Sequence, residues 1–483
     1  MKNSSHLSGF RVGFILTILS LVIFYIGIPF FELVELKAYD LHFSAEGKSN
    51  VGSEVVIVTI DEKSIDELGR WPWPRSTMAA LVESLNEYKA SVIAFDIVFS
   101  EADNTSGIKY YDELKDTLVK KGFKVSSIID RLSATKDNDV LFASAIKKSP
   151  QVILGYYFYT TDDEIAHRKK DVSSAKDKIY PAAIEKINDI DGLAITPDII
   201  TTRGIEENIA PLSKATKRFG YFNVVPDVDG TIRRAPLVME YGGKYYPHLA
   251  LAAVRAFVDS PELKLNFAEY GMDSLMLGNH RVVTDERGAA LINYRGKKKS
   301  FAHYSFSDVL SGKVEKDALA GKIVLVGATA TGIYDLRVTP VDITFPGVEI
   351  HATIIDNIMA NDFIQRPDWV FIFDVLAILI LGIFLSIFIP RLKALSAALT
   401  MVVISALYIY FNNYLFTNMN MWLTVVYPLF TIIIVTGGVS TFQYMTEERK
   451  KREIKNAFSH YVSPSLVDIV VKNPDILRLG GEE

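Results

Sequence analysis

Residues 369–389 read WVFIFDVLAILILGIFLSIFI and decide the class of this protein. The run is apolar apart from Asp374, and about 20 such residues in a helix cross the hydrocarbon core of a bilayer. Two more apolar runs follow at 394–411 and 421–440, and a fourth lies near the start of the chain at 12–31. The sequence therefore predicts an integral membrane protein with four transmembrane helices.

The first apolar run has a competing interpretation as a cleaved signal peptide. A signal peptide has a shorter apolar core, which ends in small residues at a cleavage site. This run instead ends in Gly27-Ile28-Pro29-Phe30-Phe31. We therefore expect an uncleaved membrane anchor.

Basic residues predict the orientation of the four helices. They precede the first run, separate the second from the third, and follow the fourth. These positions are Lys2, Arg11, Arg391, Lys393 and residues 449–455. If the helices alternate in direction, all of these places lie on one side, which the positive-inside rule identifies as the cytoplasm. Residues 32–368 then face outward, and both termini are cytoplasmic.

Composition excludes several classes of function. The chain of 483 residues contains no cysteine, which rules out disulfides, thiolate metal sites and cysteine nucleophiles. The absence of cysteine also fits an exported bacterial domain. The formal net charge of -5 gives no indication of a nucleic-acid partner.

The outward segment has the pattern of an α/β domain. Short apolar runs at 55–60, 91–96 and 323–326 read as strands, whereas 77–88 has apolar residues at helical spacing. Alternating helices with strands that are buried on both faces predict a largely parallel sheet.

The middle of this segment has a different pattern. Asp229-Gly230 and Gly242-Gly243 are two-residue turn motifs, and they flank a single expected strand over 232–241. This predicts an antiparallel meander inserted into the sheet or added at its edge. Polar, charge-rich stretches at 104–136 and 161–174 are interpreted as exposed excursions.

Asp61 and Asp96 each follow a predicted strand at its carboxyl end. Ligands bind at that edge of a parallel sheet, so two carboxylates there can bind a metal or act as acid and base. They can equally cap the following helices or pair with Arg70 and Arg75. Both interpretations remain open.

Between these strands, Trp71 and Trp73 alternate with prolines. Such a stiff surface suits stacking on a ligand, packing against another subunit, or covering one end of the core. The small residues at 326–332 are similar to a phosphate-binding loop but lack the Walker and dinucleotide spacings, which favours a tight strand-to-helix turn.

His351 and Arg233 complete the set of candidates. His351 follows Glu349 by two residues on a predicted helix, a spacing that does not place the two on one face, and no metal site is predicted. Arg233, in the Arg233-Arg234 pair, can bind an anion or mark a solvated strand end.

Six segments of the chain resemble a known family. They are 59–65, 69–75, 94–100, 226–230, 321–330 and 346–352. In this order they are similar to the second type of CHASE extracellular sensor domain, over most of residues 32–362. One preceding span and three following spans also resemble the family's arrangement. The resemblance implies a sensor for an extracytoplasmic ligand or protein, but it assigns no binding residues.

The end of the chain carries a second resemblance. Residues 458–464, Asn473-Pro474 and 479–482 resemble the connector before the catalytic domain of bacterial class III adenylate or guanylate cyclases. In that family the catalytic domain comes directly afterwards and holds Mg²⁺ or Mn²⁺. This chain stops at Glu483, so we expect no cofactor here. The chain is either truncated at the connector or a natural stub.

The connector, residues 441–483, has a helical pattern of its own. Ile454, Ala457, Phe458 and Tyr461 fall at i, i+3, i+4 and i+7. Such an apolar stripe can pair with its twin in a parallel homodimer, which fits the need of class III cyclases for paired domains.

These expectations combine into one hypothesis. The chain is the sensory and transmembrane regulatory module of a receptor cyclase in a bacterial inner (plasma) membrane, and it relays an outer signal to cyclic nucleotide synthesis, such as that of cAMP. Ligand candidates are Asp61, Trp71, Trp73, Arg75, Asp96, Arg233 and His351, and signal-transmission candidates are Asp374, Ile454, Phe458 and Tyr461.

Three alternatives stay open beside it. The first is a membrane-anchored outer enzyme, in which Asp61, Asp96 and His351 would line one pocket. The second is a sensor for a histidine kinase output. The third is a transport component, which only Asp374 supports among the spans.

Overall fold

The computed structural model describes residues 2–46, 51–105, 108–121, 123, 127–128, 137–166, 179–192, 198–333 and 336–459. The chain divides into two compact units. One is helical and combines Met1–His42 with Arg366–Glu483, and the other is the α/β unit Phe43–Gln365.

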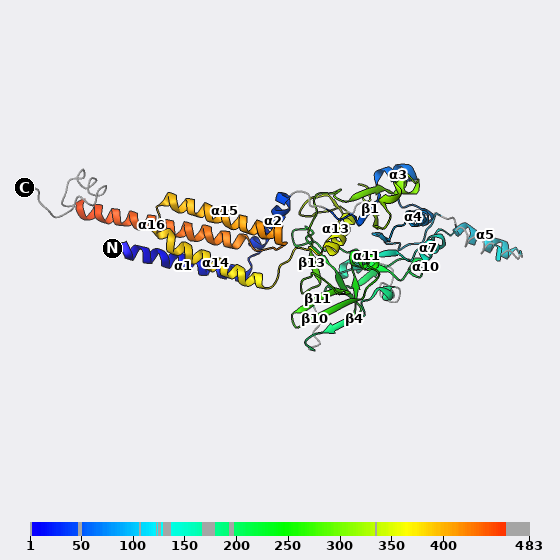
Figure 1. The fold of residues 1–483 in the computed structure, drawn as a ribbon, viewed down its shortest axis with the longest axis horizontal. Coiled ribbons are helices and arrows are strands. Elements are labelled where there is room, and N and C mark those ends of the chain that lie inside the picture. Colours follow the sequence, from blue (N-terminus) through cyan, green and yellow to red (C-terminus); the bar gives the residue numbers. More distant parts are fainter. Residues whose placement is uncertain are drawn as a thin grey trace, which may run out of the picture. The chain divides into compact units, whose positions relative to one another are not determined.

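Within the described residues, the helical unit contains four helices that are long and apolar enough to cross a membrane. They are α1 (Lys2–Ile26), α14 (Trp369–Phe388), α15 (Ala394–Met419) and α16 (Val426–Ser459). They run alongside one another, and the start of α1 lies at the same end of the bundle as the far end of α16 (Figure 1). Small residues allow close packing, because a side chain at Gly13 would meet Ser386 and one at Gly382 would meet Thr17.

The first apolar run is not one helix over 12–31 as expected. α1 ends at Ile26, Gly27 adopts a φ of 66°, and Pro29 begins a second helix, α2 (Pro29–Glu46). Glycine permits this left-handed turn, and proline suits the first turn of a new helix. Because α2 belongs largely to the helical unit, the α/β unit begins at Phe43 and not at residue 32.

The last apolar helix continues into the connector. α16 starts at Val426 and runs without a break to Ser459, so residues 441–459 extend the fourth apolar helix. Residues 460–483 lie outside the described part of the chain.

A central sheet in the order β14-β1-β15-β2-β3-β5, with β6 also paired to β3, forms the middle of the α/β unit. β1 pairs in parallel with β14 and β15, β2 pairs in parallel with β15 and β3, and β3 pairs in parallel with β6. Only β5 runs antiparallel to its neighbour in this described sheet. The prediction of a largely parallel sheet is confirmed. The strands are β1 (Val55–Ile60), β2 (Val92–Phe95), β3 (Val152–Tyr159), β5 (Gly204–Glu206), β6 (Phe219–Tyr221), β14 (Ala302–Ser305) and β15 (Ile323–Ala328).

Helices cover both faces of this sheet. Val56, Val58 and Ile60 of β1 join one core with α4 and other helices on that side. The alternate side chains, such as Ile57 and Leu325, point to the opposite face, where α11 and α13 pack against the strands. The helices are α3 (Glu62–Leu68), α4 (Arg75–Glu87), α7 (Asn138–Lys148), α12 (Phe306–Leu310), α11 (Leu249–Phe257) and α13 (Gly347–Ala360).

The antiparallel part differs from its prediction. The single strand expected over 232–241 is wrong, because β7 (Arg234–Pro236) pairs with β13 (Ala289–Leu291) and β8 (Val238–Tyr241) pairs with β9 (Lys244–Pro247). Pro236 has no backbone N–H, which favours a break in the strand there. The Gly242-Gly243 turn is confirmed, with φ values of 61° and 81°.

The main meander forms a separate sheet, not an addition to the central one. Its order is β12-β11-β10-β4, with β10 (Leu263–Ala268), β11 (Gly271–Leu277), β12 (His280–Val282) and β4 (Lys186–Asp189). In the expected excursion at 104–136, α5 (Ile108–Lys120) extends outward from the α/β unit (Figure 1). The other elements are α8 (Asp162–Ala166), α10 (Ala210–Ser213), β16 (Leu336–Arg337), β17 (Phe345–Pro346) and 3-10 helices at Tyr180–Ala182, Lys316–Ala318 and Ile389–Arg391.

Candidate functional site

Two of the candidate residues meet at the carboxyl edge of the central sheet. Asp96 directly follows β2, and its backbone N–H donates to the Val326 carbonyl at 2.9 Å. Its Oδ1 lies 3.4 Å from Nε2 of His351 on α13. The two side chains are 6% and 2% exposed, so this carboxylate–imidazole contact is shielded from water.

Gly327 allows α13 to bring His351 to this place. Gly327 lies inside β15, and a Cβ there would be 2.7 Å from the Val348 side chain. The expected tight strand-to-helix turn at 326–332 is therefore wrong, because β15 continues through Ala328 and the next described α-helix, α13, begins only at Gly347. The glycine serves the close packing of strand against helix.

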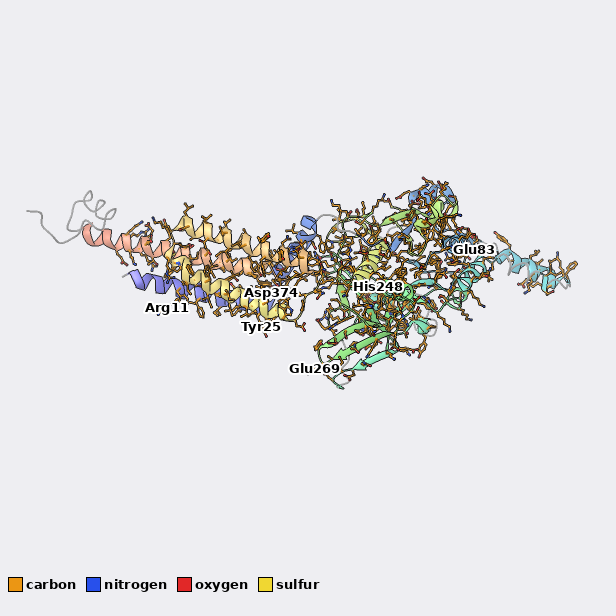
Figure 2. All side chains as sticks on the ribbon, in the orientation of Figure 1. Arg11, Tyr25, Glu83, His248, Glu269 and Asp374 are labelled. Carbon is orange, nitrogen blue, oxygen red and sulfur yellow. The ribbon has the colours of Figure 1, made fainter. Side chains whose placement is uncertain are left out.

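His248 is a third member of this group, and sequence reasoning did not single it out. It caps α11, its Nδ1 accepts the Ala250 N–H at 3.1 Å, and its ring centroid lies 5.0 Å from that of His351. Figure 2 marks His248 inside the α/β unit. Burial lowers the pKa of His248 well below its ordinary value, and repulsion from His351 lowers it further.

This histidine–histidine–aspartate group is enclosed. Nε2 of His248 and Nδ1 of His351 lack a hydrogen-bond partner in the part of the chain that the structure describes. Across the same residues, no set of three or more His, Asp or Glu side chains is placed to hold a metal ion. The arrangement can hold β2, α11 and α13 in register and respond to protonation, but it offers a substrate no open surface.

Asp61 does not join this group. It caps α3, accepting the Ser64 N–H at 2.9 Å and the Ser64 hydroxyl at 2.6 Å, and Ser305 donates to its other oxygen. Burial raises the pKa of Asp61, but these hydrogen bonds outweigh burial and hold it below its ordinary value. The capping interpretation of Asp61 matches this geometry, and its expected pairing with Arg70 or Arg75 does not.

The tryptophan segment covers the core. Trp73 is 3% exposed, donates from Nε1 to the Gly69 carbonyl at 2.7 Å and packs on Phe306. Trp71 is half-buried beside it and packs against the same core. Of the interpretations left open, the geometry favours the covering of one end of the core.

Arg75 and Arg233 both have acidic neighbours. Arg75 lies over the Phe99 ring, with its Nε 3.8 Å from Asp139. Arg233 is 1% exposed and bonds Asp227 and Asp229, each at 2.9 Å. The expected solvated strand end at Arg233 is therefore wrong. Both arginines carry structural ion pairs, because a buried charge requires a partner.

Asp374 has partners inside the helical unit. Figure 2 marks it on α14, where it is fully buried by the chain itself. Thr424 donates to Oδ2, and Nη2 of Arg366 lies 3.8 Å from the same oxygen. The simpler expectation, that Asp374 only reaches interfacial water, does not describe this contact.

The remaining transmission candidates lie at the end of α16. Ile454 and Phe458 belong to this helix, whose backbone is described to Ser459, whereas their side chains are not described. Tyr461 lies outside the described residues. The proposed apolar stripe stays a prediction.

Sequence reasoning also missed a basic cavity beside β6 and α11, lined in part by Lys217, Arg218 and Arg255. Lys217-Arg218 is a visible basic pair in the sequence. Arg255 lies far away along the chain and reaches the same cavity only because α11 packs against β6.

Comparison with known proteins gives one match. The model of the family described as the CHASE2 domain matches residues 15–388, from within α1 to the last residue of α14. No curated protein and no solved structure gives a match. The family is a family of sensor domains, and its model spans most of this chain. The chain therefore belongs to the CHASE2 domain family.

Proposed function

We propose that this chain is the sensory and transmembrane regulatory module of a receptor adenylate or guanylate cyclase. One observation carries the proposal: in this sensor-family chain, the helix α16 is far longer than a membrane span. The 34 residues of α16 cover roughly 50 Å, against about 30 Å for the hydrocarbon core of a bilayer. The helix therefore suits the transfer of a displacement from the bundle to a domain beyond it.

The orientation in the membrane follows from the basic residues. Basic residues lie in the first part of α1, just after α14 and late in α16, and by the positive-inside rule they support a cytoplasmic location for that end of the bundle in a bacterial cell. The start of α1 and the far end of α16 lie at one end of the bundle (Figure 1), which fits two cytoplasmic termini. The α/β unit then lies outside the inner membrane.

The start of α16 is the place where we expect the signal to enter this helix. Glu35 on α2 accepts the N–H groups of Val425, at 3.0 Å and 3.2 Å, and of Val426, at 2.8 Å. A carboxylate at a helix N-terminus is favoured by the unpaired N–H groups and the helix dipole.

Further contacts hold the residue shortly before α16. Arg366 donates to Oγ1 of Thr424 at 3.2 Å, Tyr408 of α15 donates to its carbonyl at 2.8 Å, and Thr424 itself donates to Asp374. α2 leads into the α/β unit and Arg366 follows it, so both chain connections of the sensor contact the same helix end. A ligand of the α/β unit can move α16 only if it binds two conformational states of the protein with different affinity.

The likeness of residues 458–464, Asn473-Pro474 and 479–482 to the cyclase connector supports a cyclase as the output. Class III cyclases need paired catalytic domains, so the module works as a homodimer. The outer-enzyme alternative loses support, because Asp61 bonds Ser64 and Ser305 while Asp96 meets His351 in an enclosed group.

The proposal is tested by fusing the chain at Glu483 to a bare class III cyclase domain and measuring cyclic AMP formation in membranes. Inserting two alanines after Arg452 rotates the downstream part of the helix by about 200°, whereas seven residues restore the phase to within about 20°. We expect the two-residue insertion and deletion of residues 43–365 to change activity, and the seven-residue insertion to preserve it. Equal activity in all of these fusions contradicts the proposal.

A further inference from the structure

A second candidate site lies away from the Asp96–His351 contact. A cavity of about 190 Å³ opens beside the first residue of β6 and the last turns of α11. β6 runs parallel to β3, and the cavity lies where β6 begins, whereas Asp61 and Asp96 follow the carboxyl ends of their strands. The lining residues that could contact a ligand by charge, hydrogen bonding or apolar packing are Lys217, Arg218, Phe219, Pro247, Arg255 and Ser260.

The cavity is strongly cationic. Its lining contains Lys217, Arg218 and Arg255 and no carboxylate. Among the described residues, none of the three forms a salt bridge. Burial lowers the pKa of Arg255, and the nearby Arg218 lowers it further, while Glu262 and Glu185 offset part of this. Glu262 itself pairs with Lys186 at 2.9 Å. Two partly buried guanidinium groups at one cavity that no carboxylate lines favour the binding of an anion between them.

Hydrogen bonds fix the guanidinium group of Arg255 and the main chain of Arg218. Nε of Arg255 donates to the Pro261 carbonyl at 2.8 Å, which leaves its two terminal nitrogens available. The Arg218 N–H donates to Oγ1 of Thr216 at 3.0 Å, and its carbonyl accepts the Leu154 N–H at 3.1 Å. The fixed guanidinium group of Arg255 reduces the entropy cost of binding.

The chain after α11 adopts an uncommon conformation at the rim of the cavity. Asp259 and Ser260 have φ values of 61° and 57°, a left-handed region that residues other than glycine rarely adopt. The Ser260 N–H donates to the Arg255 carbonyl at 2.7 Å, which returns the chain over the last turn of the helix. This turn places Ser260 in the lining, where its hydroxyl adds a hydrogen-bonding group.

We infer that this cavity binds a small organic anion, with its carboxylate or phosphate group between Arg218 and Arg255 and its carbon chain against Phe219 and Pro247. Guanidinium groups match both anions with paired hydrogen bonds. An apolar cavity of about 150 Å³ holds benzene, so this one accommodates a ligand of a few carbon atoms. The inference goes beyond the proposed function, because it concerns binding whether or not the chain controls a cyclase.

Isothermal titration of the full chain in detergent tests this site. The probes are succinate, glycerol 3-phosphate and inorganic phosphate, with the uncharged succinamide as the neutral counterpart of succinate. We expect saturable binding of succinate or glycerol 3-phosphate, and the tighter of the two identifies carboxylate or phosphate as the natural group. The inference is rejected if neither binds, if succinamide binds as tightly as succinate, or if inorganic phosphate binds as tightly as the organic anions.

Variants locate the binding. Arg218→Gln and Arg255→Gln each raise the dissociation constant of the organic anion by about tenfold or more, because each variant loses charge-assisted hydrogen bonds to the anion. Arg287→Gln removes an equal charge from an arginine that is 63% exposed and pairs with Asp198, and it leaves binding unchanged. Ala256→Leu, which keeps the charge and fills the cavity, abolishes binding in a chain whose circular dichroism is unaltered. Equal weakening in Arg287→Gln, or full affinity in Ala256→Leu, overturns the inference.

Discussion

Replacing Gly327 with alanine inserts a methyl group between β15 and α13. The new Cβ would lie 2.7 Å from both Cβ and Cγ2 of Val348, and 3.3 Å from Oδ2 of Asp96. Carbon atoms pack best at about 3.5–4.0 Å, so α13 must retreat by about 1 Å. The helix is buried along most of its length, which leaves it little room to do so.

This overpacking has an estimable cost. Inserting a methyl group into a packed core typically destabilises a protein by about 1–3 kcal/mol. If about 320 residues unfold together, an unfolding entropy of about 2.1 cal/mol/K per residue corresponds to roughly 1.5 °C per kcal/mol. We therefore expect Gly327→Ala to lower the Tm by roughly 1.5–4.5 °C.

Gly332→Ala is the matched control. Gly332 does not have a left-handed φ, and a Cβ there would meet no atom of the described residues within 4 Å. Alanine at such a position is neutral or stabilises by up to about 1 kcal/mol, through the unfolded chain. Scanning calorimetry of the detergent-solubilised chains, at one scan rate, compares the two variants. An unchanged Tm for Gly327→Ala, or an equal loss in Gly332→Ala, would refute the packing role of Gly327.

Four further predictions concern protonation, the start of α16, orientation and assembly. The folded state holds the pKa of His248 below its ordinary 6.5, whereas the unfolded chain takes up a proton on this residue near that pH. The free energy of unfolding should therefore fall as the pH drops below 6.5, by up to about 1.4 kcal/mol per pH unit. His248→Asn, which keeps a capping oxygen, should flatten this slope in denaturant unfolding, and an identical slope would exclude His248 as its source. Glu35→Gln should destabilise the bundle by about 1.5–3 kcal/mol and shift the activity of the cyclase fusion. Glu32→Gln, at an exposed position, should do neither. Equal effects of the two variants would argue against the entry of the signal into α16 at Glu35. An impermeant maleimide on intact cells should label Asn104→Cys but not Ser459→Cys, and the reverse pattern would invert the proposed orientation. Charged replacements of Ile454 and Phe458 should raise the dimer dissociation constant measured by sedimentation, so a monomeric parent chain, or an unchanged constant, would contradict the stripe.

The parallel sheet could be predicted because its strands have a local pattern. Apolar runs such as 55–60 are buried on both faces, and this composition distinguishes them without knowledge of their partners. The break after α1 was also visible, since Gly27 and Pro29 stand together, but the continuing apolar residues Phe30 and Phe31 extended the expected helix. Hydrophobicity alone does not indicate where a helix ends.

The candidate site could be predicted only in part. Asp96 and His351 were each singled out, but their contact depends on α13 folding back over β15, far along the chain from β2. His248 gave no local indication, because its burial results from the packing of α11 against α13. Arg233 was misjudged for the same reason: its partners Asp227 and Asp229 are near in sequence, but its burial depends on the rest of the domain.

The carboxylate of Glu35 also limits the geometry of any movement at α16. It accepts hydrogen bonds from two successive backbone N–H groups, and sliding the helix by one residue, about 1.5 Å along its axis, would separate these donors from their acceptor. A translation of α16 along its axis would therefore break the Glu35 hydrogen bonds through which we expect the signal to enter the helix. We expect the permitted degrees of freedom to be rotation about the helix axis and tilting around the pinned end. A tilt has a lever arm: across the roughly 50 Å of α16, an inclination of only a few degrees moves the far end by several ångströms.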